Sequence, residues 1–209
     1  MTRKSHPNIT TILFDLGEVV FTNDWTFYCP EKDQEFQSHY QCPDFVFTKS
    51  SYFNDLYTGK ITEEEYWKKS LQEVEAKTTD PQKAIEISHK YQREKPGMLN
   101  LIKTLKRNGY KLGVITNTYK EMLKWKIEKF ELASYFQEII ASCDIGFEKP
   151  DKRIYQEALE KMGSKPHESI FIDDQMKNVE GAKKLNIHTI YFQSYDQLVS
   201  ELEKFGINS

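Results

Sequence analysis

Carboxylate, hydroxyl, amide and amine side chains follow four apolar runs of this sequence, each within a few residues of where its run ends. Carboxylates from separate segments can hold a magnesium ion, which takes oxygen ligands. A lysine and a threonine hydroxyl can neutralise and orient phosphate oxygens, and a carboxylate can also act as a nucleophile. The set therefore predicts magnesium-assisted phosphoryl chemistry. Its members are Asp15, Thr116, Asn117, Lys149, Asp173 and Asp174.

A parallel β-sheet would bring these side chains together, because ligands bind at the carboxyl ends of the strands in such a sheet. The apolar runs are rich in Ile, Val, Phe and Tyr, which is typical of strands buried on both faces. Amphipathic helical patterns lie between the later runs and indicate helices on both faces of the sheet. We therefore predict an α/β fold with a Rossmann-like three-layer core. The strands are expected at 9–14, 110–116, 137–142, 169–173 and 187–192, and the helices within 96–109, 150–163 and 178–186.

The segment from residue 22 to residue 95 breaks this alternation and contains no buried-strand run. It is aromatic-rich at first ("WTFYC", "DFVF", "SYFNDLY") and then helical, with Thr62 and Glu65 at the spacing of a capping box. We predict a helical cap at 22–95, inserted into a discontinuous core of 1–21 and 96–209. Its aromatic residues either form the core of this module or line a substrate pocket.

Composition narrows the possible partners. The net charge of -3 supplies no basic surface for nucleic acid. The apolar runs are too short to span a bilayer, and the N-terminal residues lack the apolar core of a signal peptide. The three cysteines show no paired spacing, which is typical of a reducing compartment. We expect a cytoplasmic protein that binds neither nucleic acid nor membrane.

Each polar residue alone has a more common structural role. An Asp at a strand end often caps a helix, Thr116 and Asn117 have the residue types of a turn, and a lone lysine such as Lys149 is usually solvated. The functional interpretation depends on their joint occurrence, since each lies just after its own strand run.

The order of these motifs resembles that of the haloacid dehalogenase-like (HAD) hydrolases. In that family a nucleophilic Asp, a Thr or Ser, a Lys and an acidic pair follow one another along the chain. The resemblance covers residues 9–20 and about 96–193, and the last two motifs are long and specific. The corresponding stretches read "ILFDLGEVV", "GVITNT", "EKPDKRIYQEALEKMG" and "SIFIDDQMKNVEGAKKLNIHTIYF".

The resemblance implies a nucleophile and a set of magnesium ligands. Asp15 would attack the phosphate and also bind the metal, together with the main-chain carbonyl of Gly17 and the carboxylate of Asp174. Asp173 would lie beside the metal, and Asn178 would orient the acidic loop.

The same resemblance implies that Thr116, Asn117 and Lys149 hold the phosphate and that the segment 22–95 is a cap of the first type, which closes over the site and sets specificity. The nearest subgroup contains the epoxide-hydrolase N-terminal phosphatase and bacterial sugar-phosphate phosphatases. The expected partner is a small phosphate ester, with a sugar phosphate as one candidate.

Gly17 departs from the family pattern, which has a second Asp that protonates the leaving oxygen and activates water. Such proton transfer is worth about 10²–10⁴-fold, so its loss would slow both steps and favour substrates with good leaving groups. Glu18 is adjacent, but we expect it to face solvent.

Three alternatives remain open. A haloacid dehalogenase uses the same nucleophile without a metal, and a non-catalytic binding protein could retain the fold. A receiver domain also phosphorylates an Asp, but its acidic pair follows the first strand, where this sequence has none.

Overall fold

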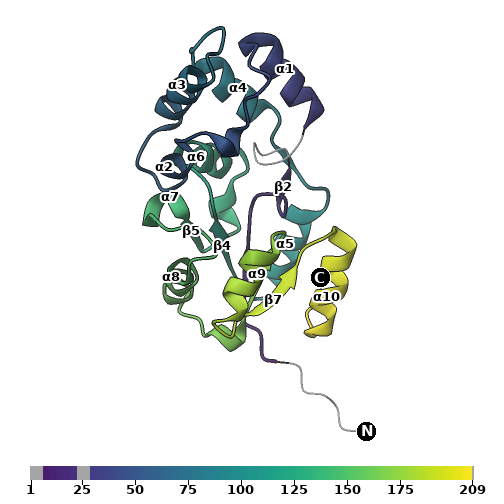
Figure 1. The fold of residues 1–209 in the computed structure, drawn as a ribbon. Coiled ribbons are helices and arrows are strands. Elements are labelled where there is room, and N and C mark those ends of the chain that lie inside the picture. The colour runs from purple at the N-terminus through teal and green to yellow at the C-terminus, as the bar shows by residue number, and fades with distance from the viewer. Residues whose placement is uncertain (1–6, 23–28, 209) are drawn as a thin grey trace.

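A computed structural model describes residues 7–22 and 29–208 of the chain. Its centre is a five-stranded parallel sheet in the order β5-β4-β1-β6-β7 (Figure 1). The predicted α/β class and all five predicted strands are confirmed. The strands are β1 (Thr11–Phe14), β4 (Lys111–Thr116), β5 (Glu138–Ala141), β6 (Ser169–Asp173) and β7 (His188–Tyr191).

The sheet is buried on both faces, as its apolar strands require. Ile12 and Phe14 of β1 contact one apolar cluster, which includes α5 and α10, while Leu13 between them belongs to a second cluster with α8 and α9. This alternation follows from the period of two in a strand. It gives the predicted three layers, with helices α5 (Met98–Arg107), α6 (Lys120–Lys129), α7 (Ser142–Ile145), α8 (Lys152–Met162), α9 (Met176–Lys183) and α10 (Tyr195–Lys204).

A helical insert follows β1 and lies beyond one end of the sheet, at the top of Figure 1. The predicted capping box at Thr62 and Glu65 starts its third helix. Two short antiparallel strands, β2 (Phe21–Thr22) and β3 (Arg93–Glu94), pair where the chain leaves and re-enters the core. The insert contains α1 (Pro30–Tyr40), α2 (Phe53–Tyr57), α3 (Glu63–Glu73) and α4 (Gln82–Lys90).

Most aromatic residues of the insert form its own core. Phe36, Phe47 and Trp67 are buried in one cluster, as the first of the two interpretations predicted. Phe53 and Tyr57 also line a cavity, so the second interpretation holds for them as well. The aromatic residues at 25–28 lie outside the described part of the chain.

The insert is packed tightly against the core at three points. Tyr119, just before α6, belongs to the aromatic cluster of the insert. The Ser142 hydroxyl donates to the main-chain carbonyl of Tyr57 at 2.7 Å. Gly59 has a φ of +72°, and a Cβ there would lie 2.2 Å from the carbonyl oxygen of Cys143. Close approach of the two main chains therefore requires glycine at this position.

A buried carboxylate also lies at this junction. Glu63 of α3 is 1% exposed, and its Oε1 accepts hydrogen bonds from Tyr119 at 3.1 Å, from Trp67 at 3.3 Å and from Ser88 at 3.3 Å. Its Oε2 is buried without a partner among the described residues. Burial raises the pKa of Glu63 to about 7.

Within the described residues no helix combines the length and the apolarity needed to cross a bilayer.

Cys29, Cys42 and Cys143 are buried free thiols, and Cys143 packs in the core as a small apolar residue, as its sequence context predicted.

Candidate active site

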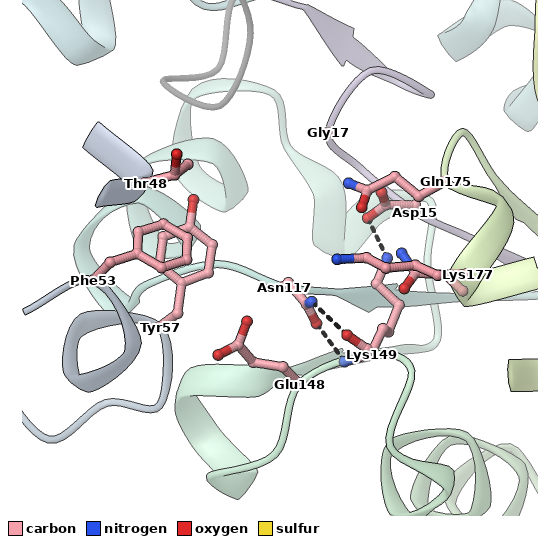
Figure 2. A pocket seen from close by; sticks show the side chains of 11 residues that line it. Asp15, Gly17, Thr48, Phe53, Tyr57, Asn117, Glu148, Lys149, Gln175 and Lys177 are labelled. Atoms are coloured by element: carbon pink, nitrogen blue, oxygen red, sulfur yellow. Dashed lines mark hydrogen bonds and ion pairs between the residues drawn. The ribbon is translucent and has the colours of Figure 1, made fainter. Parts of the chain in front are cut away.

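Asp15 lies at the carboxyl end of the central strand, where the strand order of the sheet reverses. It is 6% exposed, and its Oδ1 accepts a hydrogen bond from the main-chain N–H of Leu16 at 2.7 Å. Its charged neighbours are Lys149, from the segment after β5 and α7, and Asp173 and Asp174 at the end of β6. They meet because the ends of parallel strands lie at one edge of the sheet. Figure 2 shows Asp15 at one wall of a cavity that opens between core and insert.

Lys149 connects two of the predicted acids. Its Nζ lies 2.8 Å from Asp15 Oδ1 and 2.7 Å from Asp173 Oδ2, and the lysine side chain is 1% exposed. Burial would lower the pKa of Lys149, but the two carboxylates outweigh this effect and raise it, so the group remains an ammonium. For Asp15, burial raises the pKa and Lys149 opposes the rise.

Asn117 fixes the main chain of Lys149. Its Oδ1 accepts from the Lys149 N–H at 2.8 Å, and its Nδ2 donates to the Lys149 carbonyl at 3.1 Å (Figure 2). Asn117 lines the cavity, but both ends of its amide are engaged by the main chain. Its position therefore favours a role in placing Lys149 over the predicted direct contact with phosphate.

Thr116 is the last residue of β4 and is 2% exposed. It is not among the residues that line the cavity.

The two adjacent acids have different environments. Asp173 is fully buried, and besides Lys149 it accepts from the Gln175 N–H at 2.8 Å and from Asn178 Nδ2 at 3.0 Å and 3.1 Å. Both of its oxygens are therefore engaged. The Asn178 amide donates directly to this carboxylate, and its role in orienting the acidic loop stays a prediction.

Asp174, in contrast, has an Oδ1 that is buried without a partner among the described residues. Burial, with a contribution from Asp173, raises the pKa of Asp174 to about 6. Asp15, Asp173 and Asp174 each offer an oxygen, and these three atoms lie within 4.8 Å of one another. An orphaned carboxylate oxygen and an all-oxygen donor set fit a hard divalent cation such as Mg²⁺.

Gly17 lines the cavity, and a Cβ built there would meet no atom within 4 Å. The position therefore has room for a side chain that the sequence does not supply. The neighbouring Glu18 does not fill this space. Its Oε2 forms an ion pair with Lys95 Nζ at 2.8 Å, and its side chain is 16% exposed, so the expectation that Glu18 faces solvent is wrong.

The cavity has a volume of about 440 Å³ and is bounded by both parts of the molecule. The sequence did not single out several of its lining residues. Glu148 and Lys177 adjoin predicted site residues, but nothing in the sequence indicated where they point. The residues missed are Thr48 of the insert, and Glu148, Gln175 and Lys177 of the core. Phe53 and Tyr57, which also line the cavity, belong to the aromatic residues for which a pocket was one of the two interpretations.

Comparison with known proteins gives one family model and several similar proteins. Residues 39–192 match the family model described as haloacid dehalogenase-like hydrolase. A glyceraldehyde 3-phosphate phosphatase of Pyrococcus furiosus is 32% identical over 120 residues, which are 56% of this chain and 50% of that protein. The bifunctional epoxide hydrolase 2 of Sus scrofa is 31% identical over 111 residues, 51% of this chain and 20% of that protein.

A solved structure of a HAD family enzyme from Bacteroides thetaiotaomicron, in complex with magnesium and inorganic phosphate, superposes with a TM-score of 0.75. It is 22% identical, and the match covers 91% of this chain and 98% of that chain, so it establishes the fold. Matches to the first curated relatives span about half of their length or less.

Proposed function

Because this chain belongs to the haloacid dehalogenase-like hydrolase family, we propose that it is a magnesium-dependent phosphohydrolase acting on a small phosphorylated metabolite. One observation carries the proposal. A buried Asp15–Lys149 ion pair adjoins an unpartnered oxygen of Asp174, and the same cavity is open to a substrate. We assign the core to residues 1–21 and 96–209 and the cap to residues 22–95.

In the proposed reaction Asp15 is the nucleophile. One of its carboxylate oxygens attacks phosphorus, the ester P–O bond breaks, and the leaving alkoxide takes a proton from water. Water then hydrolyses the phospho-aspartate, which releases inorganic phosphate and restores Asp15. Lys149 neutralises phosphate oxygens as they approach, and Thr116 is assigned to the same phosphate.

Asp173 and Asn178 stabilise this arrangement. Asp173 binds the Lys149 ammonium that lies beside Asp15, and Asn178 donates to Asp173. Asp15, Asp174 and the main-chain carbonyl of Gly17 would hold the metal. When bound, magnesium supplies charge stabilisation to the transferring phosphoryl group without proton transfer.

The missing side chain at Gly17 constrains the substrate. Without an acid to protonate the leaving oxygen, hydrolysis is slowed least for substrates that have a good leaving group, such as an anomeric phosphate or an acyl phosphate. The similarity to a glyceraldehyde 3-phosphate phosphatase and the cavity of about 440 Å³ both support a small sugar phosphate.

A haloacid dehalogenase would use the same Asp15 on a carbon–halogen bond. It needs no metal, and the orphaned oxygen of Asp174 favours the phosphatase over this alternative. A binding protein that retains the fold would have no need of the buried Asp15–Lys149 pair, which is costly to keep charged.

One experiment tests these options together. Phosphate release is measured over a panel of sugar, acyl and aryl phosphates with magnesium and with EDTA, and chloride release from 2-chloropropionate is measured in EDTA. We expect turnover of phosphate esters only with magnesium. Chloride release in EDTA would favour the dehalogenase, and no turnover of any ester would favour the binding protein.

A further inference from the structure

We propose that Glu148 is a specificity-determining residue, which selects substrates whose body carries hydroxyl groups and disfavours substrates whose body carries a second anion. The inference rests on the proposed phosphohydrolase function and concerns the part of the substrate that leaves.

Glu148 lies on the wall of the cavity, away from the nucleophile. Figure 2 shows its carboxylate between the Tyr57 ring and Asn117, in the part of the cavity where the insert faces the core. In-line attack by Asp15 on phosphorus places the leaving group on the far side of the phosphate, toward the insert. The body of a bound ester therefore reaches Glu148, Phe53 and Tyr57.

The carboxylate of Glu148 is half-buried and not engaged. It makes no hydrogen bond or ion pair with the described residues, unlike Asp15, Asp173 and Glu18, each of which contacts a lysine. Burial raises the pKa of Glu148, and the charge of Lys177 opposes the rise. Lys177 is exposed and forms no ion pair with Glu148 within the described chain, so its charge acts on the carboxylate only from a distance.

A free carboxylate beside aromatic rings prefers a ligand with hydroxyl groups on a carbon skeleton. It accepts hydrogen bonds from hydroxyl groups, while the faces of Phe53 and Tyr57 offer apolar contact to the carbon skeleton. A carboxylate or second phosphate on the substrate body would meet the Glu148 charge in a partly desolvated space, where charge repulsion is only weakly screened. Such repulsion is a direct means of rejecting a wrong ligand.

The test compares two aryl phosphates of similar size, 4-(hydroxymethyl)phenyl phosphate and 4-carboxyphenyl phosphate, in the presence of magnesium. We expect the wild type to prefer the hydroxymethyl compound in kcat/KM, and Glu148→Gln to reduce that preference by about tenfold or more. Because the wild type and Glu148→Gln act on the same two compounds, the difference in leaving-group chemistry between the compounds affects both enzymes equally. The matched control is Glu160→Gln, which removes an exposed charge from α8 and should leave the preference unchanged.

Binding of the corresponding phosphonates, measured by calorimetry with magnesium, gives a readout that needs no turnover. Equal preference in the wild type and in Glu148→Gln, by kinetics or by Kd, would overturn the inference. If the phosphonates bind with the expected ratio but no phosphate ester of the panel is hydrolysed, the role of Glu148 in ligand selection stands and the proposed function fails. Thermal unfolding of both variants verifies that they fold.

Discussion

The side chain of Asn117 is joined to the main chain of Lys149 by two hydrogen bonds. Its Oδ1 accepts from the Lys149 N–H at 2.8 Å, and its Nδ2 donates to the Lys149 carbonyl at 3.1 Å. This pair connects the loop after β4 to the loop that carries the lysine. It fixes the Lys149 main chain, from which the ammonium reaches Asp15 at 2.8 Å. The geometry around Asp15, the proposed nucleophile, therefore depends on a residue that need not touch the substrate.

Asn117→Ala should release the Lys149 loop. We expect kcat to fall by about 10–100-fold, because small misplacements of catalytic groups cost about that much, and stability to fall by about 1–3 kcal/mol as buried polar groups lose their partners. Steady-state kinetics and denaturant unfolding measure both effects. Asn117→Asp, which keeps the acceptor, should be affected less in both measurements. An unchanged kcat in Asn117→Ala would contradict the positioning role.

Gly17→Asp should increase activity. A Cβ at this position meets no atom within 4 Å, so the carboxylate can be added to the cavity wall without displacing a neighbour. Because a positioned acid–base group is worth about 10²–10⁴-fold, we expect the largest gain with poor leaving groups such as alkyl phosphates. Gly17→Asn is the control of similar size without a titratable proton. Equal rates for the two variants would show that proton transfer is not what the wild type lacks.

Glu63 should make the protein less stable as pH rises. Its pKa is about 7 in the folded protein and 4.5 in the reference state, so the folded state holds the proton more tightly. The contribution of this bound proton to the free energy of unfolding is fully present below about pH 4.5 and is lost as pH rises through about 7. One pKa unit corresponds to about 1.4 kcal/mol, so the loss is on the order of 3 kcal/mol.

Glu63→Gln should remove this part of the pH dependence. Denaturant unfolding at pH 5 and pH 8 provides the measurement, and the variant should gain stability relative to wild type at pH 8. Glu64→Gln, on the exposed side of the same helix, should follow the wild-type curve. A Glu63→Gln curve parallel to wild type would contradict the buried-proton interpretation.

Gly59→Ala tests how the insert is packed on the core. The new Cβ would combine a φ of +72° with a 2.2 Å approach to the carbonyl oxygen of Cys143, at an expected cost of roughly 2–4 kcal/mol. Gly109→Ala is the matched control, since its φ is +89° but a Cβ there meets nothing within 4 Å. If both variants lose the same stability, as measured by denaturant unfolding, the close contact contributes nothing.

The fold could be predicted from the sequence because its signals are local. The strands such as β1 are buried on both faces and read as continuous apolar runs, and helices such as α8 end at a glycine with a positive φ, Gly163. The convergence of Asp15, Lys149 and Asp173 was predictable for the same reason, since parallel strand ends meet at one edge.

The direction of individual side chains could not be predicted. The two amide hydrogen bonds of Asn117, the ion pair of Glu18 with Lys95 and the free carboxylate of Glu148 depend on loops whose conformation is set by distant contacts. The aromatic residues of the insert had two interpretations for the same reason. Only the packing of α2 decides that Phe53 and Tyr57 line the cavity.

We expect Asp15 to carry the phosphoryl group during turnover. Because Gly17 offers no base to activate water, hydrolysis of the phospho-aspartate should be slow and the intermediate should accumulate. The decisive measurement is mass spectrometry of the enzyme quenched in acid while it turns over phenyl phosphate with magnesium. We expect a phosphoryl group on the peptide that contains Asp15, and neither this group nor turnover in Asp15→Asn. Full turnover by Asp15→Asn, or a phosphoryl group on another peptide, would contradict this expectation.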